Sequence, residues 1–211
     1  MADFAALQEA VIKGSLDEAT RLTQEALDEG TAPGKIVNDG LVPGMLVVGE
    51  KFKNNEFYVP EVLIAARAMK GAMALVQPHL KEGDLKPLAT VAIGTVQGDL
   101  HDIGKNLVAM MLEGAGFKIV DLGVDVSPEK YIDAVQNQGA TVIALSALLT
   151  TTMPSIGKTV EALKAAGLRD KVIVIIGGAP VTDAYKQEVG ADLYAADAGS
   201  AVETLKAKVA A

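Results

Sequence analysis

The chain has 211 residues, a formal net charge of −8 and an apolar content of 50%. This length suits one large domain or two small ones. The acidic balance and the lack of tryptophan argue against a nucleic-acid groove, which needs clustered Lys and Arg. The absence of cysteine excludes disulfides, zinc–thiolate sites and cysteine-bound iron–sulfur clusters, and with only 2 histidines a multi-histidine metal site within one chain is not expected.

The hydropathy pattern indicates no membrane segment. No apolar run approaches the ~20 residues of a spanning helix. The first residues are acidic rather than basic, so we expect neither a transmembrane helix nor a signal peptide, and we predict a cytoplasmic protein without membrane or nucleic-acid partners. The acidic surface fits solubility or docking to protein partners with basic patches.

The first part of the chain, residues 1–81, is predicted to be helical. Apolar residues recur at helical spacing in segments that are joined by short polar connections. The expected helices cover residues 3–13, 16–29, 35–52 and 58–80. Ser15 is expected to cap the second helix with Glu18 as its capping-box partner, and His79 is expected at the surface. Helices with short connections predict a four-helix bundle.

The rest of the chain alternates apolar strands with helices. A polar link with Gly and Pro at residues 82–88 predicts a boundary between a helical domain, 1–84, and a second domain, 85–211. Strands are expected over 89–96, 117–122, 140–147, 172–177 and 192–195, and helices over 103–115, 128–138, 154–166, 181–189 and 199–210. The alternation predicts a flavodoxin-like (Rossmann-type) five-stranded parallel sheet with right-handed crossovers and helices on both faces.

The segment 98–106 places His101 in the loop between the first strand and its helix. In an open α/β sheet such loops line the crevice where ligands bind. The carboxylate of Asp99 is close enough in sequence to accept the imidazole Nδ1–H and leave Nε2 as a lone-pair donor, as a metal-ligating histidine requires. Gly104 lets a large planar group approach. Alternatively, Asp99 or Asp102 caps the helix and His101 is a solvated loop residue.

A series of short motifs follows in order along the chain. D-x-H-x-x-G begins at Asp99, S-x-L at Ser146 and G-G at Gly177, with residues 105–145 and 149–176 between them. The series resembles the cobalamin-binding domain of methionine synthase and its relatives. That resemblance implies that His101 ligates the cobalt of a cobalamin or other cobamide in place of the nucleotide base. It also places these residues around the cofactor: Gly98, Asp99, Asp102, Ile103, Gly104, Ser146, Leu148, Thr150, Gly177, Gly178 and Ala196.

The same resemblance implies a hydrogen-bonded relay behind the histidine. In the family, the hydroxyl of a serine six residues after the S-x-L serine completes this relay. Here the residue six positions after Ser146 is Thr152. Asp99 and Thr152 are therefore expected to tune His101, with the added methyl group of threonine affecting the geometry. From the residues alone, Ser146 can equally close a strand, and Gly177 with Gly178 can form an ordinary strand-end turn.

The helical part carries a second resemblance. Residues 45–52, 56–62 and 65–69 are similar to the helical cap that covers the upper corrin face in methionine synthase. This implies that Phe52 and Val59 lie over the cobalt. The alternative is that both side chains belong to the bundle core.

A helical bundle followed by a corrinoid domain, with no catalytic module, resembles the free-standing corrinoid proteins of three-component methyltransferase systems. The resemblance implies a chain that is not catalytic alone. It would carry a methyl group on cobalt from a substrate-specific corrinoid methyltransferase to a second enzyme that methylates tetrahydrofolate or coenzyme M, with a reductive activase as a further partner. Methanol, methylamines, betaine and methoxylated aromatics remain open as donors. A cobalamin-dependent sensor is the alternative, whereas a nucleotide-binding domain would need a P-loop or G-x-G-x-x-G after the first strand.

Overall fold

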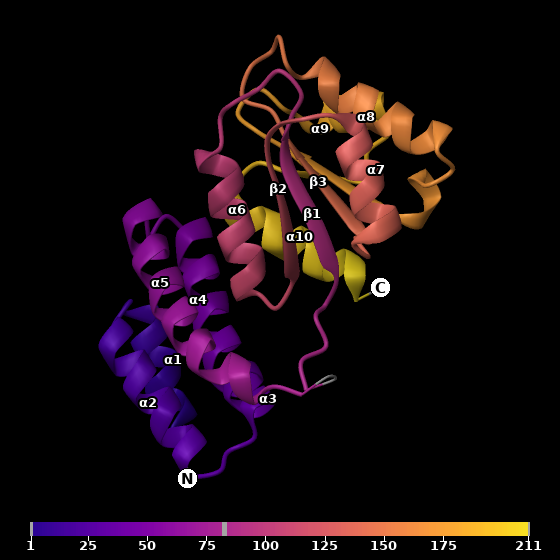
Figure 1. The fold of residues 1–211 in the computed structure, drawn as a ribbon. Coiled ribbons are helices and arrows are strands. Elements are labelled where there is room, and N and C mark those ends of the chain that lie inside the picture. Colours follow the sequence, from indigo (N-terminus) through magenta and orange to yellow (C-terminus); the bar gives the residue numbers. More distant parts are fainter. Residues whose placement is uncertain (1, 82–83, 211) are drawn as a thin grey trace. The chain divides into compact units, whose positions relative to one another are not determined.

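The computed structural model describes residues 2–81 and 84–210, which form two compact units (Figure 1). The first unit comprises the chain up to Pro87 together with Gly114–Gly116, and the second comprises Leu88–Glu113 and the chain from Phe117 onward. Residues 82–83, which belong to the predicted boundary segment, lie outside the described residues. Within the described ranges, no helix has the length and apolar character needed to span a bilayer.

The first unit is built from helices. They are α1 (Phe4–Ile12), α2 (Leu16–Asp28), α3 (Pro33–Lys35), the π-helical η1 (Ile36–Leu41), α4 (Val42–Lys53), α5 (Val59–Val76) and the 3-10 turn η2 (Gln77–His79). Leu7 and Val11 from α1, Leu41 from η1, Val48 from α4 and Val62 from α5 are buried at 1% exposure or less. The predicted helical domain is thus confirmed, and its core draws on α1, η1, α4 and α5.

The first part of the predicted helix over 35–52 is a π-helical segment, Ile36–Leu41, and the α-helix α4 follows it. Pro43 stands in the first turn of α4 and has no N–H to donate to the carbonyl of Asp39. The Asp39 carbonyl instead accepts a hydrogen bond from the side-chain Nε2 of Gln8, at 2.7 Å. The sequence pattern missed this interruption because proline in the first turn of a helix is compatible with the apolar spacing on either side.

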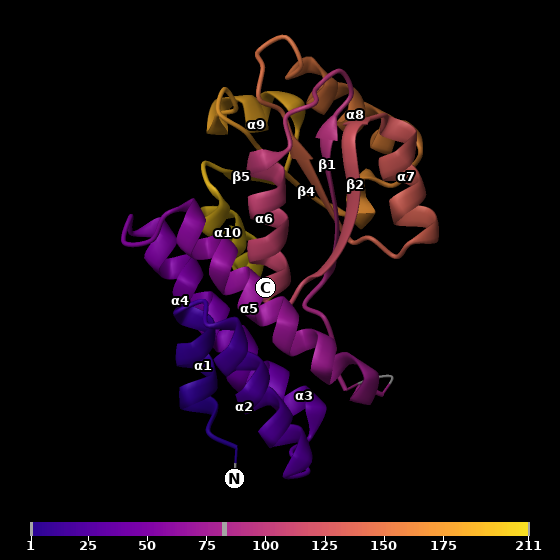
Figure 2. The same ribbon diagram turned by 60° about the vertical axis from the view of Figure 1, so that its left-hand side comes forward.

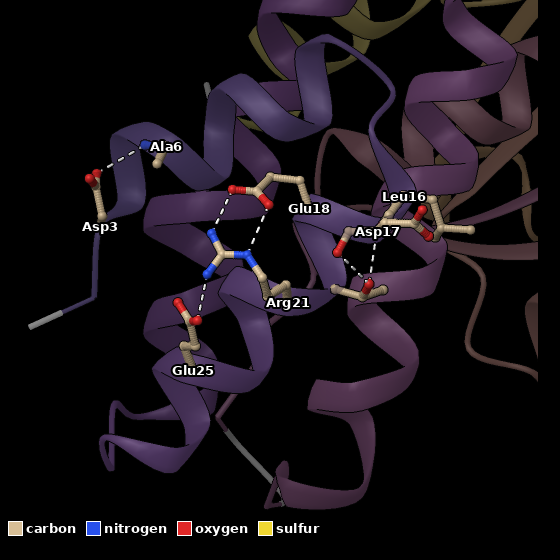
Figure 3. A network of polar contacts seen from close by, with 8 residues as sticks. Asp3, Ala6, Leu16, Asp17, Glu18, Arg21 and Glu25 are labelled. Atoms are coloured by element: carbon tan, nitrogen blue, oxygen red, sulfur yellow. Dashed lines mark hydrogen bonds and ion pairs between the residues drawn. The ribbon is translucent and has the colours of Figure 1, made fainter.

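The helix starts differ from the predicted capping (Figure 3). Asp3 caps α1, since its Oδ1 accepts a hydrogen bond from the backbone N–H of Ala6 at 3.0 Å. Ser15 occupies the N-cap position of α2, but its side chain makes no capping hydrogen bond within the described part of the chain. Glu18 binds Arg21 instead, with 2.6 Å between Oε1 and Nη2. The predicted Ser15–Glu18 capping box is therefore wrong, because a charged partner one turn away engages the glutamate.

The second unit contains the predicted parallel sheet. Its strands are β1 (Thr90–Val96), β2 (Lys118–Val126), β3 (Val142–Ser146), β4 (Ile173–Gly177) and β5 (Leu193–Ala195), in the order β2-β1-β3-β4-β5 and all parallel. The connecting helices are α6 (Ile103–Gly114), α7 (Pro128–Asn137), α8 (Pro154–Ala165), α9 (Asp183–Val189) and α10 (Ala198–Val209), with a 3-10 turn, η3 (Arg169–Lys171), after α8. The predicted α/β fold is confirmed.

The direction of the connections decides which helix covers which face. The chain moves from β1 to β2 toward one edge of the sheet and thereafter toward the other edge. Because such crossovers are right-handed, α6 lies on one face, and α7, α8 and α9 lie on the opposite face. Figures 1 and 2 show α7 and α6 on opposite sides of the strands, with α10 on the side of α6.

Side chains on the two faces of the sheet differ in size at the carboxyl end of the strands. The face toward α7 and α8 carries a buried apolar cluster that includes Ala92, Ile143, Leu145, Val174 and Ile176 from the strands and Tyr131, Ile156, Val160 and Leu163 from the helices. Strand residues alternate between faces, so the opposite face presents a different set. At its carboxyl end it has a row of small residues in register across four strands: Thr95, Ser146, Gly177 and Ala195.

The end of β2 is irregular. The strand was predicted to end at residue 122 but continues to Val126. Gly123 and Asp125 have positive φ angles of 86° and 50°, and the register with β1 shifts on either side of Gly94. Left-handed residues interrupt the alternating pattern by which a strand is recognised in sequence, which explains the short prediction.

Candidate functional site

The candidate site lies at the carboxyl ends of β1 and β3. The two strands are neighbours, yet β1 leads by α6 to one edge of the sheet and β3 leads by α8 toward the other. This is the point at which an open α/β sheet of this strand order forms its ligand crevice. The loop after β1 carries His101, and the loop after β3 carries Leu148 and Thr152.

Asp99 is the centre of the site. It is completely buried, and each of its carboxylate oxygens has two donors. Oδ1 lies 2.7 Å from Nδ1 of His101 and 3.0 Å from the backbone nitrogen of the same residue. Oδ2 accepts hydrogen bonds from the hydroxyl of Thr152 at 2.6 Å and from the backbone N–H of Leu148 at 2.8 Å. The carboxylate therefore joins the two loops and fixes the imidazole.

The hydrogen bonds keep this buried carboxyl ionised. Burial raises the pKa of Asp99. Its four hydrogen bonds have a larger effect in the opposite direction and hold the pKa well below its usual range; they come from the Thr152 hydroxyl, from the backbone N–H groups of His101 and Leu148, and from the imidazole. An ionised carboxylate can only accept, so Nδ1 of His101 carries the proton. With the proton on Nδ1, Nε2 is the nitrogen that is left to donate a lone pair, and the side chain is 48% exposed.

Further backbone contacts hold the histidine loop. The buried hydroxyl of Thr95 donates to the carbonyl oxygen of His101 at 2.9 Å. Asp125, at the end of β2, accepts from the N–H of Gly98 at 2.7 Å and donates its own N–H to the carbonyl of Asp99 at 3.0 Å. Sequence reasoning missed Thr95 and Asp125, although a charged residue two positions after Gly123 in an apolar strand was an available signal.

The S-x-L and G-G motifs meet at the same sheet edge. Ser146 is the last residue of β3 and lies in register with Thr95 on one side and Gly177 on the other. Gly178 has a φ of +128°, and a Cβ there would lie 1.9 Å from the carbonyl oxygen of Ala147, so this position requires glycine. The structure thus brings Asp99, His101, Ser146, Gly177 and Gly178 together at the carboxyl ends of β1, β3 and β4.

The remaining predicted residues have less specific surroundings. Asp102, Ile103, Gly104, Thr150 and Ala196 are exposed, and a Cβ at Gly104 would meet nothing within 4 Å. The carboxylate of Asp102 accepts from Asn106 Nδ2 at 3.1 Å. Ala196 stands between β5 and α10.

Phe52 and Val59 belong to the helical unit. Phe52 is half-buried near the end of α4, and Val59 begins α5 with 37% of its surface exposed. Neither side chain is among the fully buried residues of the bundle core.

The donor set at this edge suits a metal that arrives with other ligands. No group of three or more His, Cys, Asp or Glu side chains that could hold a bare ion occurs among the residues that the structure describes. One exposed imidazole is a single axial donor. Large exposed apolar side chains stand in these loops and at the start of α6, namely Leu100 (71% exposed), Ile103 (80%), Leu148 (42%) and Leu149 (43%), and exposed apolar side chains that gather at one site are typical of a binding face.

A row of small residues lies beside these loops. The row Thr95, Ser146, Gly177 and Ala195 has no large side chain, and a Cβ at Gly177 would lie 3.1 Å from the carbonyl oxygen of Ala195. A flat macrocycle over the apolar loops, with its tail along the small residues, matches this arrangement. Fold and site together define the class of cobalamin-binding α/β domains, here preceded in the chain by a helical domain.

Comparison with known families agrees with that class. A model described as "B12 binding domain" matches residues 89–207, and a second model of the same description matches residues 4–77. The chain belongs to the B12-binding corrinoid protein family, and its cofactor is a corrinoid.

Relatives match over nearly the full chain. The trimethylamine corrinoid protein of Methanosarcina barkeri is 42% identical over 206 residues, which are 97% of this chain and 95% of that protein. A corrinoid protein of Desulfitobacterium hafniense is 41% identical over 93% of each chain. Among solved structures, a cobalamin-binding protein from D. hafniense DCB-2 has a TM-score of 0.80 at 32% identity, covering 98% of both chains. A chain of the methanol:cobalamin methyltransferase complex from M. barkeri has a TM-score of 0.89 at 28% identity, covering 98% of this chain and 79% of that one.

Proposed function

We propose that this protein is a methyl carrier that works between two methyltransferases. The first would be a substrate-specific corrinoid methyltransferase, and the second would methylate tetrahydrofolate or coenzyme M; a reductive activase would restore the carrier after oxidation. When bound, the corrinoid supplies a cobalt centre that accepts and gives up a methyl group. The observation that carries the proposal is the buried carboxylate of Asp99 with His101 on one oxygen and Thr152 on the other.

The protein's own part in this function is to present and withdraw an imidazole. His101 would be the axial donor through Nε2, because Asp99 keeps the proton on Nδ1. When Nε2 is not donating to a metal it can take up a proton, and the ionised carboxylate of Asp99 stabilises the resulting imidazolium. Thr152 and the N–H of Leu148 hold the carboxylate in place for both states.

The other predicted residues would form the walls of the corrinoid site. Ile103, Leu148 and the open space beside Gly104 suit the macrocycle. Small or polar residues suit its side chains and tail, namely Gly98, Asp102, Ser146, Thr150, Gly177, Gly178 and Ala196. Phe52 and Val59 would cover the upper face.

A methylated amine is the proposed methyl source. Relatives named as trimethylamine or dimethylamine corrinoid proteins reach 37% to 43% identity over at least 90% of this chain. The chain from the methanol:cobalamin methyltransferase complex is 28% identical. The higher identity favours partners that act on amines.

The test is a reconstituted transfer assay. The corrinoid-loaded protein is reduced and mixed separately with a trimethylamine, a dimethylamine and a methanol methyltransferase and their substrates, and its visible spectrum is followed. We expect methylation with an amine enzyme and not with the methanol enzyme, retention in His79→Ala and loss or strong slowing in His101→Ala. Transfer from methanol alone would overturn the proposed donor, and a protein that is methylated by none of the three would contradict the carrier role for these substrates.

A further inference from the structure

The backbone at the end of β2 adopts an uncommon left-handed conformation. Asp125 has a φ of 50°, which lies in a region that residues other than glycine rarely adopt, and Gly123 has a φ of 86°. The register shifts against β1 occur at the same level. Unfavourable backbone conformations persist where surrounding contacts enforce them, and they are frequent near functional sites.

The contacts that Asp125 makes are directed at the histidine loop. Its Oδ1 accepts from the N–H of Gly98 at 2.7 Å, and its own N–H donates to the carbonyl of Asp99 at 3.0 Å. One residue thereby holds both ends of the Gly98–Asp99 dipeptide, the N–H of Gly98 and the carbonyl of Asp99. The left-handed conformation is what turns both the side chain and the N–H of Asp125 to the same dipeptide.

A second contact fixes the same part of β2 to the chain that follows the histidine. Lys105, in the first turn of α6, has a side chain that is 2% exposed, and its Nζ lies 2.6 Å and 2.8 Å from the two carboxylate oxygens of Asp121. Asp121 also accepts from the N–H of Gly123 at 2.9 Å. The irregular strand end is therefore anchored to α6 while Asp125 holds the loop before His101.

We propose that Asp125 is a positioning residue for His101, acting through its hydrogen bonds with Gly98 and Asp99. The inference rests on the proposed role of His101 as the axial donor to the corrinoid. Asp125 itself need not touch the cofactor. Its carboxylate fixes the N–H of Gly98 and its own N–H fixes the carbonyl of Asp99. Asp99 in turn fixes Nδ1 of His101, and Nε2 is thereby aimed in one direction.

Two substitutions separate the side-chain bond from the backbone conformation. Asp125→Gly keeps the left-handed conformation and removes the acceptor, whereas Asp125→Asn tolerates that conformation and keeps an Oδ1 that can accept from Gly98. Asp133→Ala is the matched control, because Asp133 accepts from Asn137 and Gln138 within and just after α7 and not from the loop.

The first readout needs no cofactor. In the apoprotein, NMR measures the hydrogen exchange of the Gly98 amide and the ring resonances of His101. We expect faster exchange and shifted ring resonances in Asp125→Gly, and wild-type values in Asp125→Asn and Asp133→Ala. The second readout is the dissociation constant for cobalamin by absorbance titration, which we expect to rise about tenfold in Asp125→Gly and to stay near the wild-type value in the other two variants.

The outcomes distinguish this inference from the proposed function. If either readout of Asp125→Gly stays at the wild-type value, or if Asp125→Asn is as impaired as Asp125→Gly, the positioning role is overturned. Nitrogen coupling from histidine in the cobalt(II) electron paramagnetic resonance spectrum of the loaded wild type decides the separate question of ligation. Absence of that coupling in the wild type would overturn the axial role of His101, whatever the apoprotein measurements give.

Discussion

The two faces of the sheet have different side chains and, in our interpretation, different tasks. Toward α7 and α8, residues such as Ile143, Ile176 and Leu163 are buried at 1% exposure or less and fill the space between sheet and helices. On the opposite face, the row from Thr95 through Ser146 to Gly177 has only small side chains at the carboxyl edge. Both faces are packed, since Val91, Ile93 and Val142 are buried on the second face as well, but only the second face has small residues at its carboxyl edge, and we infer that a ligand is received there.

The largest effect on stability is expected on the packed face. Leu163→Ala removes a side chain with 0% exposure and leaves a cavity, so the free energy of unfolding should fall by about 2–5 kcal/mol. Corrinoid affinity per folded molecule should stay near the wild-type value. Chemical denaturation and cobalamin titration measure the two quantities. A large loss of affinity with little loss of stability would contradict the assignment of this face to stability and not to cofactor binding.

The next effect is a pH-dependent change in the free energy of unfolding, and it is expected at Asp99, after the carboxyl end of β1. The pKa of Asp99 is lowered in the folded protein, so its contribution to stability is present above the ordinary carboxyl pKa of about 4 and is lost as the pH falls through the folded value. The unfolding free energy of the wild-type apoprotein should therefore decline below about pH 4 relative to Asp99→Asn. Denaturation curves at several pH values measure this, and a constant difference between the two proteins would contradict the lowered pKa.

A smaller effect, on the free energy of cobalamin binding, is expected at the row of small residues. Ser146→Val adds bulk to the row of small residues at a half-buried strand end, where a β-branched residue is well tolerated. Apoprotein stability should be unchanged or slightly higher, while the dissociation constant for cobalamin should rise about tenfold, or about 1.4 kcal/mol. Unchanged affinity in this variant would show that the row does not receive the cofactor.

The smallest effect is expected at Tyr131 on the packed face. Its hydroxyl is buried without a hydrogen-bond partner among the residues that the structure describes, and burial raises the pKa of the phenol. Removing an unsatisfied hydroxyl relieves a desolvation cost, so Tyr131→Phe should be neutral or stabilising by at most about 1 kcal/mol. Thermal unfolding measures the change, and a clear destabilisation would indicate a contact of this hydroxyl that the account lacks.

The parts of the structure that follow from local pattern were predictable from sequence. Strand and helix alternation gave the parallel sheet, and two residues of separation sufficed to pair Asp99 with His101. Thr152 also donates to Asp99, as the resemblance implied, with a distance of 2.6 Å.

The parts that depend on distant contacts were not predictable. The bond between Asp125 and Gly98 spans 27 residues and depends on a left-handed backbone at the strand end. The π-helical break before Pro43 exchanges a local hydrogen bond for one with Gln8, 31 residues away from Asp39. Neither leaves a periodic signal in the sequence.

The most direct test of the account asks whether His101 is the nitrogen ligand of the corrinoid. The protein is labelled with 15N-histidine, loaded with cobalamin, reduced to the cobalt(II) state and studied by electron paramagnetic resonance, with labelled His79→Ala as the control for the other histidine. Because the nuclear spin of the ligand nitrogen changes, we expect the nitrogen splitting to change from a triplet to a doublet in both proteins. A triplet that persists in the labelled wild type would mean that the nucleotide base of the cofactor remains on cobalt, and it would contradict the account.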